Sequence, residues 1–239
     1  MRLVVLVLFF NIILPCIDGE EVELWGECYH IDTTFYIDLS NSGLSGEIPS
    51  EIGQLINLSY LNLFENNLSG IIPPEIGNLI NLTHLELDNN SLSGNIPSEI
   101  GLLTNLTHLG LYTNQLYGEI PSEVYGLNNL YVLDLSDNAL EGTISSEIED
   151  LINLRALYLW NNNLSGEIPP EIGNLYYLEI LEIAANQLTG QIPLEICQLP
   201  YLRNISLGWN QLSGTIPSEI GNLQFLENIN LERNQLEGI

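Results

Sequence analysis

The stretch "LSGEIPSEIGQLINLSYLNLFENN", residues 44–67, is followed at once by a near copy of itself. Residues 68–91 read "LSGIIPPEIGNLINLTHLELDNNS", and residues 164–187 read "LSGEIPPEIGNLYYLEILEIAANQ". The unit recurs every 24 residues, without insertion or deletion, from Leu44 to the start of a further copy at Leu236. A fixed period of this length predicts a solenoid, in which each unit buries its apolar face against its neighbours.

Each unit contains two local patterns. Residues 60–66, "YLNLFEN", place Leu61 and Leu63 on one side and the intervening residues on the other, which predicts a short strand. Residues 46–55, "GEIPSEIGQL", bring two Gly and a Pro close together. That composition favours turns or a single turn of 3₁₀-helix over a strand or a long helix.

The frame L-x-x-L-x-L-x-x-N-x-L-S-G-x-I-P resembles the plant-type leucine-rich repeat. In one unit it is carried by Leu58, Leu61, Leu63, Asn66, Leu68, Ser69, Gly70, Ile72 and Pro73. The resemblance covers about residues 24–239 and implies an α/β-type repeat solenoid, a right-handed superhelix. A parallel β-sheet of about nine strands would form its concave face, and turns or 3₁₀ segments its convex face. Such repeats form the ectodomains of plant receptor-like kinases, polygalacturonase-inhibiting proteins and secreted bacterial proteins.

An Asn recurs where each strand ends, beginning at Asn66. Its amide can satisfy backbone groups where the chain bends away from the sheet, and stacked amides can also bond one another. We therefore interpret this column as structural. The equivalent residues are Asn90, Asn114, Asn138, Asn162, Asn186, Asn210 and Asn234.

The amino-terminal segment has the pattern of a secretory signal peptide. Residues 1–19 contain one Arg, a long apolar run, Pro15 and the small Gly19, after which we expect cleavage. An uncleaved membrane anchor is the alternative, although residues 3–14 are short for a span. The predicted organisation is a signal peptide (1–19), an amino-terminal cap with the first strand (20–43), eight repeats (44–235) and the start of an incomplete further repeat without a carboxyl cap (236–239). The missing cap favours a fragment of a longer protein.

Cleavage after Gly19 would leave two cysteines, Cys28 and Cys197. Six or more units separate them, so we expect that they cannot form a disulfide with each other. Residues 24–49 resemble the amino-terminal cap of the family, including Trp25 and Cys28. The plant caps pair their cysteines, and the mature chain would contain no partner for Cys28. This departure favours a bacterial or otherwise divergent secreted protein.

The chain is strongly acidic, with a formal net charge of −27 and no Lys. Such a chain repels the phosphate backbone, which excludes nucleic acid as a partner. A Glu recurs at the start of each expected 3₁₀ turn, as in Glu51, which follows Pro49 by two residues, and Glu75. There its negative charge interacts favourably with the free backbone N–H groups of the turn.

The residues that differ between units lie on the concave face of the expected sheet, in four columns. The first column contains Tyr36, Tyr60, His84, His108, Val132, Ala156, Ile180, Asn204 and Asn228. The second contains Asp38, Asn62, Glu86, Gly110, Asp134, Tyr158, Glu182, Ser206 and Asn230. The third contains Ser40, Phe64, Asp88, Tyr112, Ser136, Trp160, Ala184, Gly208 and Glu232. The fourth contains Asn41, Glu65, Asn89, Thr113, Asp137, Asn161, Ala185, Trp209 and Arg233.

Aromatic side chains on a solvated sheet cost solubility unless they contact something, and here carboxylates alternate with them. We therefore expect this face to bind a basic or polar ligand, although aromatics also pair across strands without any ligand. The candidate ligand-binding residues are Tyr60, Phe64, His84, Glu86, Asp88, His108, Tyr112, Asp134, Tyr158, Trp160, Glu182 and Trp209.

We expect no enzyme and no cofactor. His84, His108 and Glu86 could in principle hold a metal, and Glu86 with Asp88 is a carboxylate pair of the kind found in glycosidases. Catalysis, however, needs a cleft that excludes water, and uninterrupted units provide none.

Seven N-x-S/T sequons would be glycosylation sites in a eukaryotic secretory pathway. Most follow from the repeat itself, and modification of Asn89 or Asn204 would obstruct the concave face. The acceptors are Asn57, Asn67, Asn81, Asn89, Asn105, Asn163 and Asn204.

Two hypotheses follow. The first is a secreted or cell-surface recognition module whose concave face binds an extracellular protein, peptide or glycan. The second is a structural or adhesive spacer of a longer cell-surface protein, without a discrete ligand. Membrane association is expected only if the amino-terminal segment stays uncleaved.

Overall fold

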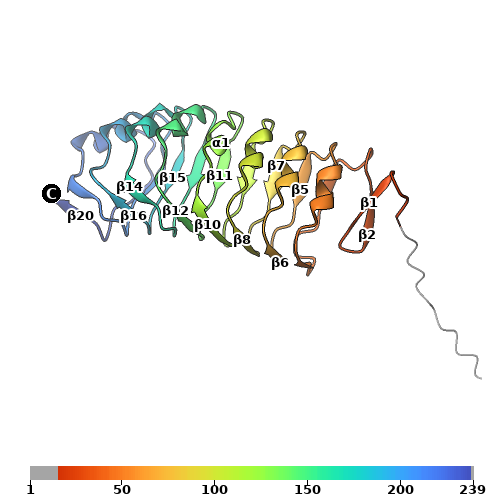
Figure 1. The fold of residues 1–239 in the computed structure, drawn as a ribbon. Helices are drawn as coiled ribbons and strands as arrows, with labels where there is room; N and C mark the ends of the chain where they lie inside the picture. Colours follow the sequence, from red (N-terminus) through yellow and green to blue (C-terminus); the bar gives the residue numbers. More distant parts are fainter. Residues whose placement is uncertain (1–15, 238–239) are drawn as a thin grey trace, which may run out of the picture.

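The computed structural model describes residues 16–237, which form an elongated stack of similar turns (Figure 1). One parallel sheet runs through the described residues with nine strands in sequence order, which confirms the expected fold. Its strands are β3 (Tyr36–Asp38), β5 (Tyr60–Asn62), β7 (His84–Glu86), β9 (His108–Gly110), β11 (Val132–Asp134), β13 (Ala156–Tyr158), β15 (Ile180–Glu182), β17 (Asn204–Ser206) and β19 (Asn228–Asn230).

Short helical turns lie opposite the sheet, as expected from the Pro and Gly of each unit. Seven are 3₁₀ turns and one is a single α-helical turn within the described residues. They are η1 (Ser50–Gln54), η2 (Pro74–Asn78), η3 (Ser98–Leu102), α1 (Ser122–Tyr125), η4 (Ser146–Asp150), η5 (Pro170–Asn174), η6 (Leu194–Gln198) and η7 (Ser218–Asn222).

A second set of short parallel strands follows the Asn column, a feature that sequence reasoning missed. Five pair in one sheet: β4 (Ser45–Gly46), β6 (Asn67–Gly70), β8 (Ser91–Gly94), β10 (Gln115–Glu119) and β12 (Ala139–Glu141). Later ones pair only two by two: β14 (Ser165–Glu167) with β16 (Gln187–Thr189), and β18 (Ser213–Thr215) with β20 (Gln235–Glu237).

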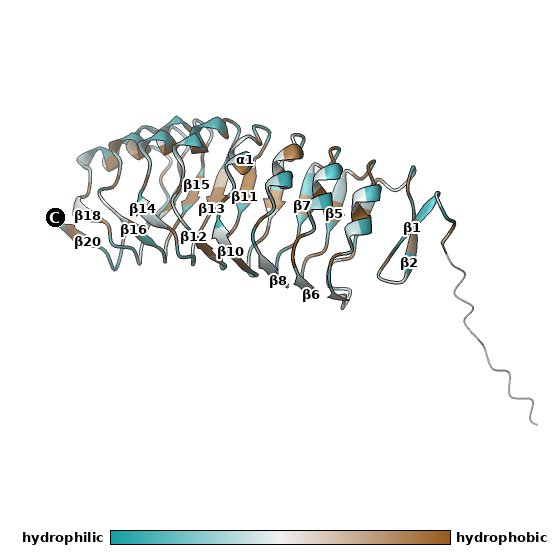
Figure 2. Ribbon diagram, in the orientation of Figure 1, coloured by the Kyte–Doolittle hydropathy of each residue, from teal (hydrophilic) through white to brown (hydrophobic). Residues whose placement is uncertain are grey.

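The core is one continuous column of aliphatic side chains between the sheet and the helical turns. Leu61 and Leu63 are fully buried, whereas Tyr60 and Asn62 on the other side of the strand are half-buried. Hydrophobic residues recur at the same places in successive units (Figure 2). Each layer therefore depends on the layers before and after it.

The Asn column holds the bend after each strand. The Asn66 Oδ1 atom accepts hydrogen bonds from the Ser42 and Leu44 N–H groups, at 3.1 and 3.0 Å. Its Nδ2 group donates to the Leu39 and Leu63 carbonyl oxygens, at 2.8 and 2.9 Å. The amides bind the backbone of two successive units, and Asn90 through Asn210 repeat the same pattern.

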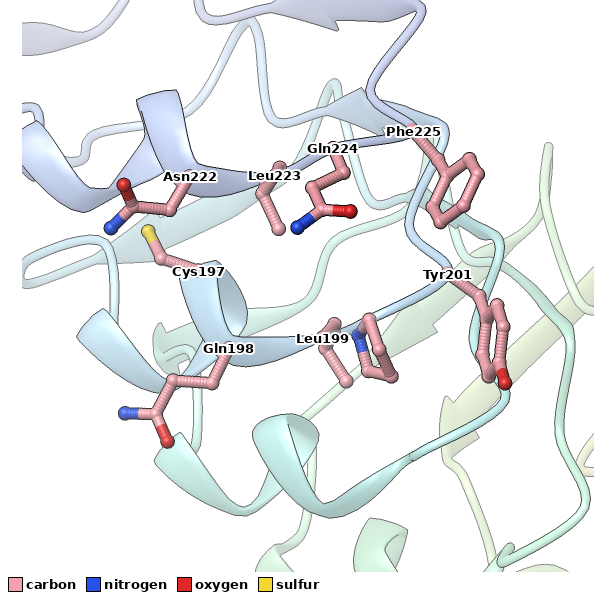
Figure 3. Close-up of a pocket in the computed structure, with 9 residues that line it drawn as sticks. Cys197, Gln198, Leu199, Tyr201, Asn222, Leu223, Gln224 and Phe225 are labelled. Carbon is pink, nitrogen blue, oxygen red and sulfur yellow. The ribbon is translucent and has the colours of Figure 1, made fainter.

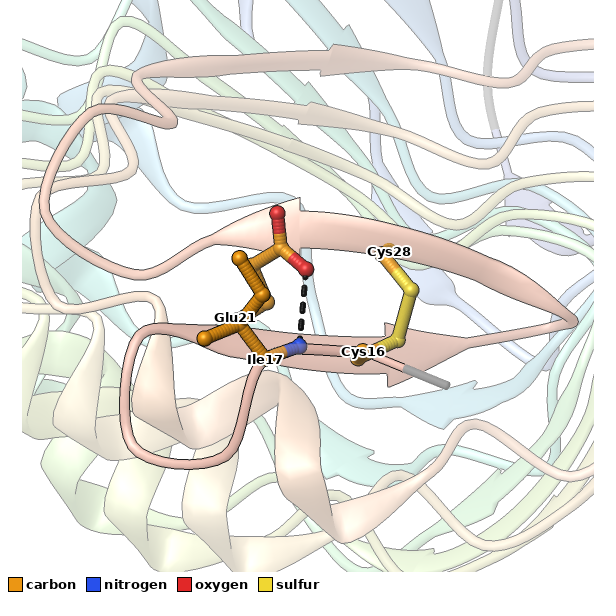
Figure 4. Close-up of a disulfide and its surroundings, with 4 residues drawn as sticks. All are labelled: Cys16, Ile17, Glu21 and Cys28. Atoms are coloured by element: carbon orange, nitrogen blue, oxygen red, sulfur yellow. Dashed lines mark hydrogen bonds between the residues drawn. A yellow bond between two sulfur atoms is a disulfide. The ribbon is translucent and has the colours of Figure 1, made fainter. Parts of the chain in front are cut away.

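The amino-terminal cap is an antiparallel hairpin of β1 (Glu21–Leu24) and β2 (Glu27–His30). Cys16 forms a disulfide with Cys28 on this hairpin, with 5.5 Å between the Cα atoms (Figure 4). The prediction that Cys28 lacks a partner is therefore wrong, because Cys16 was assigned to the leader. The cap no longer departs from the plant pattern, and this argument for a divergent source falls away. Cys197 is free and buried, away from Cys28.

Most of the predicted leader, residues 1–15, lies outside the described residues, so cleavage stays a prediction. A cut after Gly19 would remove Cys16, so a chain that keeps the disulfide must be cut before that residue. No helix within residues 16–237 is long and apolar enough to cross a membrane. The predicted 236–239 segment begins with part of β20, and its last two residues also lie outside the description.

Candidate functional site on the concave face

The strand pairing places the variable residues in the columns that the sequence predicts. In the first column Tyr60 is directly paired with Tyr36 and His84, and His84 with His108. The rings follow one another along the sheet: Tyr36 stacks on Tyr60 and His84 on His108, with centroids 4.5 and 4.3 Å apart, and the Tyr60 and His84 rings are tilted by 39° with centroids 5.4 Å apart. Four neighbouring units thus present a continuous aromatic strip.

The two imidazoles are held by hydroxyl groups of the preceding residues. Thr83 Oγ1 lies 3.0 Å from His84 Nδ1, and Thr107 Oγ1 lies 2.9 Å from His108 Nδ1. Burial, and then the neighbouring His84, lower the pKa of His108. The nearly parallel rings, 9° apart, are stacked face to face and do not converge on one point.

Beside the strip, the second and third columns bring together three carboxylates, of which Asp88 is buried and Glu86 and Asp134 are half-buried. Glu86 and Asp88 both lie over Gly110, where an added Cβ would collide with oxygen atoms of both side chains. Asp134 occupies the next position in the second column, paired with Gly110 across β9 and β11. The absence of a side chain at Gly110 gives the carboxylates of Glu86 and Asp88 the space that they occupy.

The environment of these carboxylates raises their pKa values. Burial, and then the charge of Glu86, raise the pKa of Asp88 from 3.8 to about 9, although its Oδ1 accepts a hydrogen bond from the Tyr112 N–H at 2.7 Å. Burial also raises the pKa of Glu86, with the charge of Asp134 adding to the effect. Burial raises the pKa of Asp134, against hydrogen bonds from Ser136. At neutral pH this group of carboxyls therefore holds at least one proton.

Two further predicted residues extend the acidic cluster along the sheet. Burial, and then Asp134, raise the pKa of Glu182. Burial, followed by the charges of Glu182 and Asp134, raises the pKa of Tyr158. The cluster consists of Glu86, Asp88 and Asp134 with Tyr158 and Glu182 beside it.

The remaining predicted residues fall into separate places. The Phe64 and Tyr112 rings lie 6.4 Å apart, and Asn89 Nδ2 donates to the Tyr112 hydroxyl at 2.6 Å. Trp160 is half-buried in the third column. Trp209 is not part of this group: it lies near the carboxyl end, 51% exposed, with the Arg233 guanidinium 4.1 Å from its ring centroid.

The fourth column has a backbone property that no residue pattern revealed. All nine of its residues have φ between +49° and +56°, the left-handed conformation that L-residues seldom adopt. Asn tolerates this conformation, but the residue types of Thr113, Ala185 and Trp209 do not indicate a positive φ. The chain has to turn sharply between the sheet and the Asn column, and this geometry is imposed on whichever residue occupies the position.

The sequons fall partly on structural amides. Asn57, Asn81 and Asn105 donate their side-chain N–H groups to backbone carbonyls of the preceding unit, at 3.1, 2.8 and 2.9 Å. Asn204 lies in the first column, where its Oδ1 accepts a hydrogen bond from Asn228 at 3.1 Å. Glycosylation of these residues stays a prediction.

Within residues 16–237, one group of three metal-ligating side chains has its ligand atoms within 4.8 Å of one another: Cys16, Glu21 and Cys28. The two cysteines are joined by the disulfide, and Glu21 accepts a hydrogen bond from the Ile17 N–H at 2.9 Å (Figure 4). These atoms are therefore occupied by bonds within the cap.

Two family models match the chain. The model of the leucine-rich repeat region matches residues 119–237, and the leucine-rich repeat model matches residues 35–55, 57–79 and 81–103. Together with the nine-stranded solenoid, these matches show that the chain belongs to the leucine-rich repeat proteins. A search of curated protein sequences found no significant match.

Several solved structures are similar to this chain. The plant peptide hormone receptor RGFR1 in complex with RGF2 is 43% identical, with a TM-score of 0.83, over 84% of this chain and 32% of the receptor chain. The Arabidopsis receptor kinase HAESA, in complex with the peptide hormone IDA and the co-receptor SERK1, is 34% identical, with a TM-score of 0.75, over 84% and 38%. A plant ice-binding protein is 29% identical, with a TM-score of 0.69, over 93% and 76%. This chain therefore spans about a third of the length of the receptor structures it matches.

Proposed function

We propose that this protein is an extracellular ligand-binding module whose concave face takes a peptide through a basic side chain. The observation that carries the proposal is the cluster of Glu86, Asp88 and Asp134 beside the aromatic strip, which consists of Tyr36, Tyr60, His84 and His108. An ammonium or guanidinium group would receive opposite charge from the carboxylates, and the rest of the peptide would lie against the rings. The similarity to receptors solved with peptide hormones supports a peptide over other ligands.

Export is supported by two independent features. The amino-terminal segment has the composition of a secretory leader, and a disulfide between Cys16 and Cys28 is stable in oxidising compartments. The net charge of −27 gives long-range attraction for cationic ligands, which salt would weaken.

The protonation of the cluster gives the proposal a specific signature. A bound cation favours the ionised carboxylates, whereas the free protein holds a proton on Asp88 up to a pKa of about 9. Binding must therefore release a proton, and the affinity must rise with pH across the neutral and mildly alkaline range.

The test is calorimetric titration with a panel of short peptides that differ only by Arg or Gln at one position. Glu86→Gln should weaken binding of the Arg peptides by about tenfold, whereas Glu51→Gln on the convex side should not. If a folded protein binds none of the peptides, the proposal is wrong and the chain is better described as a spacer.

Ice binding is a second candidate. The similarity to a plant ice-binding protein covers more of both chains than the receptor matches do. This chain has a row of exposed, evenly spaced amides held rigid by backbone hydrogen bonds: Asn57, Asn81, Asn105, Asn129 and Asn153. An ice recrystallisation assay tests this candidate function. Inhibition of recrystallisation by the protein, weakened in Asn105→Ala, would support it.

A further inference from the structure

The seventh unit departs from the repeat in one short segment. Residues 197–201 read "CQLPY", where the first and second units read "GQLIN" (53–57) and "GNLIN" (77–81). Three of the five positions change, and all three changes affect the space between η6 and η7.

The Gly at the first of these positions allows close packing of consecutive turns. A Cβ atom added at Gly53 would lie 2.6 Å from the Glu75 carbonyl oxygen, and one at Gly77 would lie 2.6 Å from that of Glu99. Cys197 carries a real Cβ at this position, so the Glu219 end of η7 has to lie further away. Two other units also lack Gly at this position, but neither has an open space there. The side chain of Tyr125 is itself buried, and Glu149 accepts a hydrogen bond from Asn174 of the next unit at 2.7 Å.

The two turns that border this space have more extended backbones than the earlier ones. Leu199, which precedes Pro200, has ψ of 114°, and Leu223 has ψ of 100°, against values between 52° and 71° for the equivalent leucines of η1 to η5. In those units the turn is closed by a hydrogen bond such as that from the Leu82 N–H to the Leu79 carbonyl, at 2.8 Å. The corresponding bond from Leu202 to Leu199 is missing among the described residues.

The result is a cleft of about 320 Å³ between the seventh and eighth units (Figure 3). Cys197 and Asn222 lie at one end, and the rings of Tyr201 and Phe225 lie at the other, with their centroids 6.5 Å apart. This volume is near the lower end of the range of ligand pockets, about 300–1,000 Å³. The cleft lies on the helical turns and the segments after them, apart from the concave columns.

The lining of the cleft is uncharged, in a chain with 31 acidic residues. Four other surface hollows, including those beside η1 and η6, each contain at least one carboxylate. The cleft contains the side-chain amides of Gln198, Asn222 and Gln224, which make no hydrogen bond to protein groups among the described residues. It therefore offers aromatic faces and neutral hydrogen-bonding groups, and the Arg203 guanidinium, 5.8 Å from the Phe225 ring centroid, lies outside its lining.

We propose that this cleft binds a neutral carbohydrate. The apolar face of a sugar ring would pack on Tyr201 and Phe225, and its hydroxyls would bond to the amides of Gln198, Asn222 and Gln224. An anion is disfavoured by the field of a −27 chain, and a cation would prefer the carboxylates elsewhere on the surface. Burial, and then the charges of Glu219 and Glu195, raise the pKa of the Cys197 thiol, so this Cys is a wall of the cleft and not a nucleophile.

Neighbouring residues extend the aromatic end of the site. The Tyr177 and Tyr201 rings stack with centroids 6.3 Å apart, and Tyr176 meets Tyr201 edge-on at 5.5 Å. A sugar chain longer than the cleft would therefore continue across exposed rings.

The test uses saturation-transfer NMR and calorimetry on the whole chain, with cellotetraose and xylotetraose as neutral probes and trigalacturonate as the anionic control. Tyr201→Ala should weaken binding of a neutral probe by about tenfold, and Gln224→Ala severalfold. The matched control is Tyr131→Ala, an exposed aromatic on the same edge that does not line the cleft, and it should leave the affinity unchanged. Cys197→Gly, which allows η7 to approach, should also weaken binding.

Three results would overturn the proposal: no saturation transfer from either neutral probe to a folded chain, equal binding of trigalacturonate, or an affinity that Tyr201→Ala leaves unchanged. Glu86→Gln should have no effect on the neutral probes. Failure here therefore leaves the concave peptide site untouched, and failure of that site leaves this one untouched.

Discussion

At one position in each unit, on the turn that leads into the sheet, the earlier units carry an Asn and the last three carry Tyr177, Tyr201 and Phe225. The Asn side chains, from Asn57 to Asn153, each donate a hydrogen bond to the preceding unit. The aromatic side chains stack on one another and stay exposed. The same edge therefore contributes hydrogen bonds between units in the first part of the chain and a surface of exposed rings in the second.

Other features divide the chain at the same place. Three Arg side chains lie at positions 155–233, and two of them bind Glu179 and Glu227 on the aromatic edge, at distances of 3.1 Å for Arg155 and 2.7 Å for Arg203. The second set of strands is continuous over β4–β12 and then breaks into pairs. The acidic cluster belongs to β7–β11, whereas the last concave strands present Asn204, Ser206 and Asn230. The acidic cluster and the exposed aromatic edge therefore lie in different parts of the chain.

The largest expected effect is on the free energy of unfolding, and it distinguishes a core layer packed on both sides from the last layer of the described residues. Ile205 and Ile229 are directly paired, but Ile205 is 2% exposed and Ile229 is 45% exposed. Ile205→Ala should lower the free energy of unfolding by about 2–5 kcal/mol, because it leaves a cavity between two packed layers. Ile229→Ala should cost about 1 kcal/mol or less. Urea denaturation of both variants measures the difference, and equal losses would contradict the account of the core.

The next largest effect is the loss of stability expected when the disulfide of the amino-terminal cap is removed. Replacing both Cys16 and Cys28 by Ser should lower the stability by about 2–4 kcal/mol, because the unfolded chain regains the freedom of a closed loop. A reductant should destabilise the wild-type protein and leave the double variant unchanged. If the reductant affects both proteins alike, the disulfide is not the cause.

The acidic cluster predicts a dependence of stability on pH that the last units should lack. The folded-state pKa of Asp88, about 9, exceeds its ordinary value of 3.8, so the folded state binds more protons and its stability falls as pH rises through that interval. The loss of stability is steepest between the two pKa values and ends above the folded-state pKa. Asp88→Asn should flatten the curve of unfolding free energy against pH. Glu232→Gln, which removes an exposed carboxylate from the same column, is the matched control.

The smallest effect concerns the edge itself. Asn105→Ala should cost about 0.5–1.5 kcal/mol, because it removes a hydrogen bond to the Ile80 carbonyl. Tyr201→Ala should change stability by about 0.5 kcal/mol or less, because its ring is 41% exposed and contacts Tyr177 and Phe225 only through stacking at the surface. Thermal unfolding compares the two, and a larger loss for Tyr201→Ala would remove the distinction between the two regions.

Units of constant length made the sheet and its columns predictable, because counting 24 residues from Tyr60 gives the strand partner His84. Two features were hidden by local composition. Cys16 lies in an apolar run that resembles a leader, and Gly46 was expected in a turn although it pairs with Leu68 between β4 and β6. The protonation of Asp88 could not be inferred from residue types, because it depends on how deeply the side chain lies over Gly110.

The central claim is that the carboxylates over Gly110 bind a basic side chain of a peptide. Calorimetry of an Arg-containing peptide at pH 6.5 and pH 8, in buffers of different ionisation enthalpy, tests it most directly. The account predicts tighter binding at pH 8, release of a proton on binding, loss of both effects in Asp88→Asn, and weaker binding in Glu86→Gln. An affinity that is independent of pH and of Glu86, or no binding by the folded chain, would contradict it.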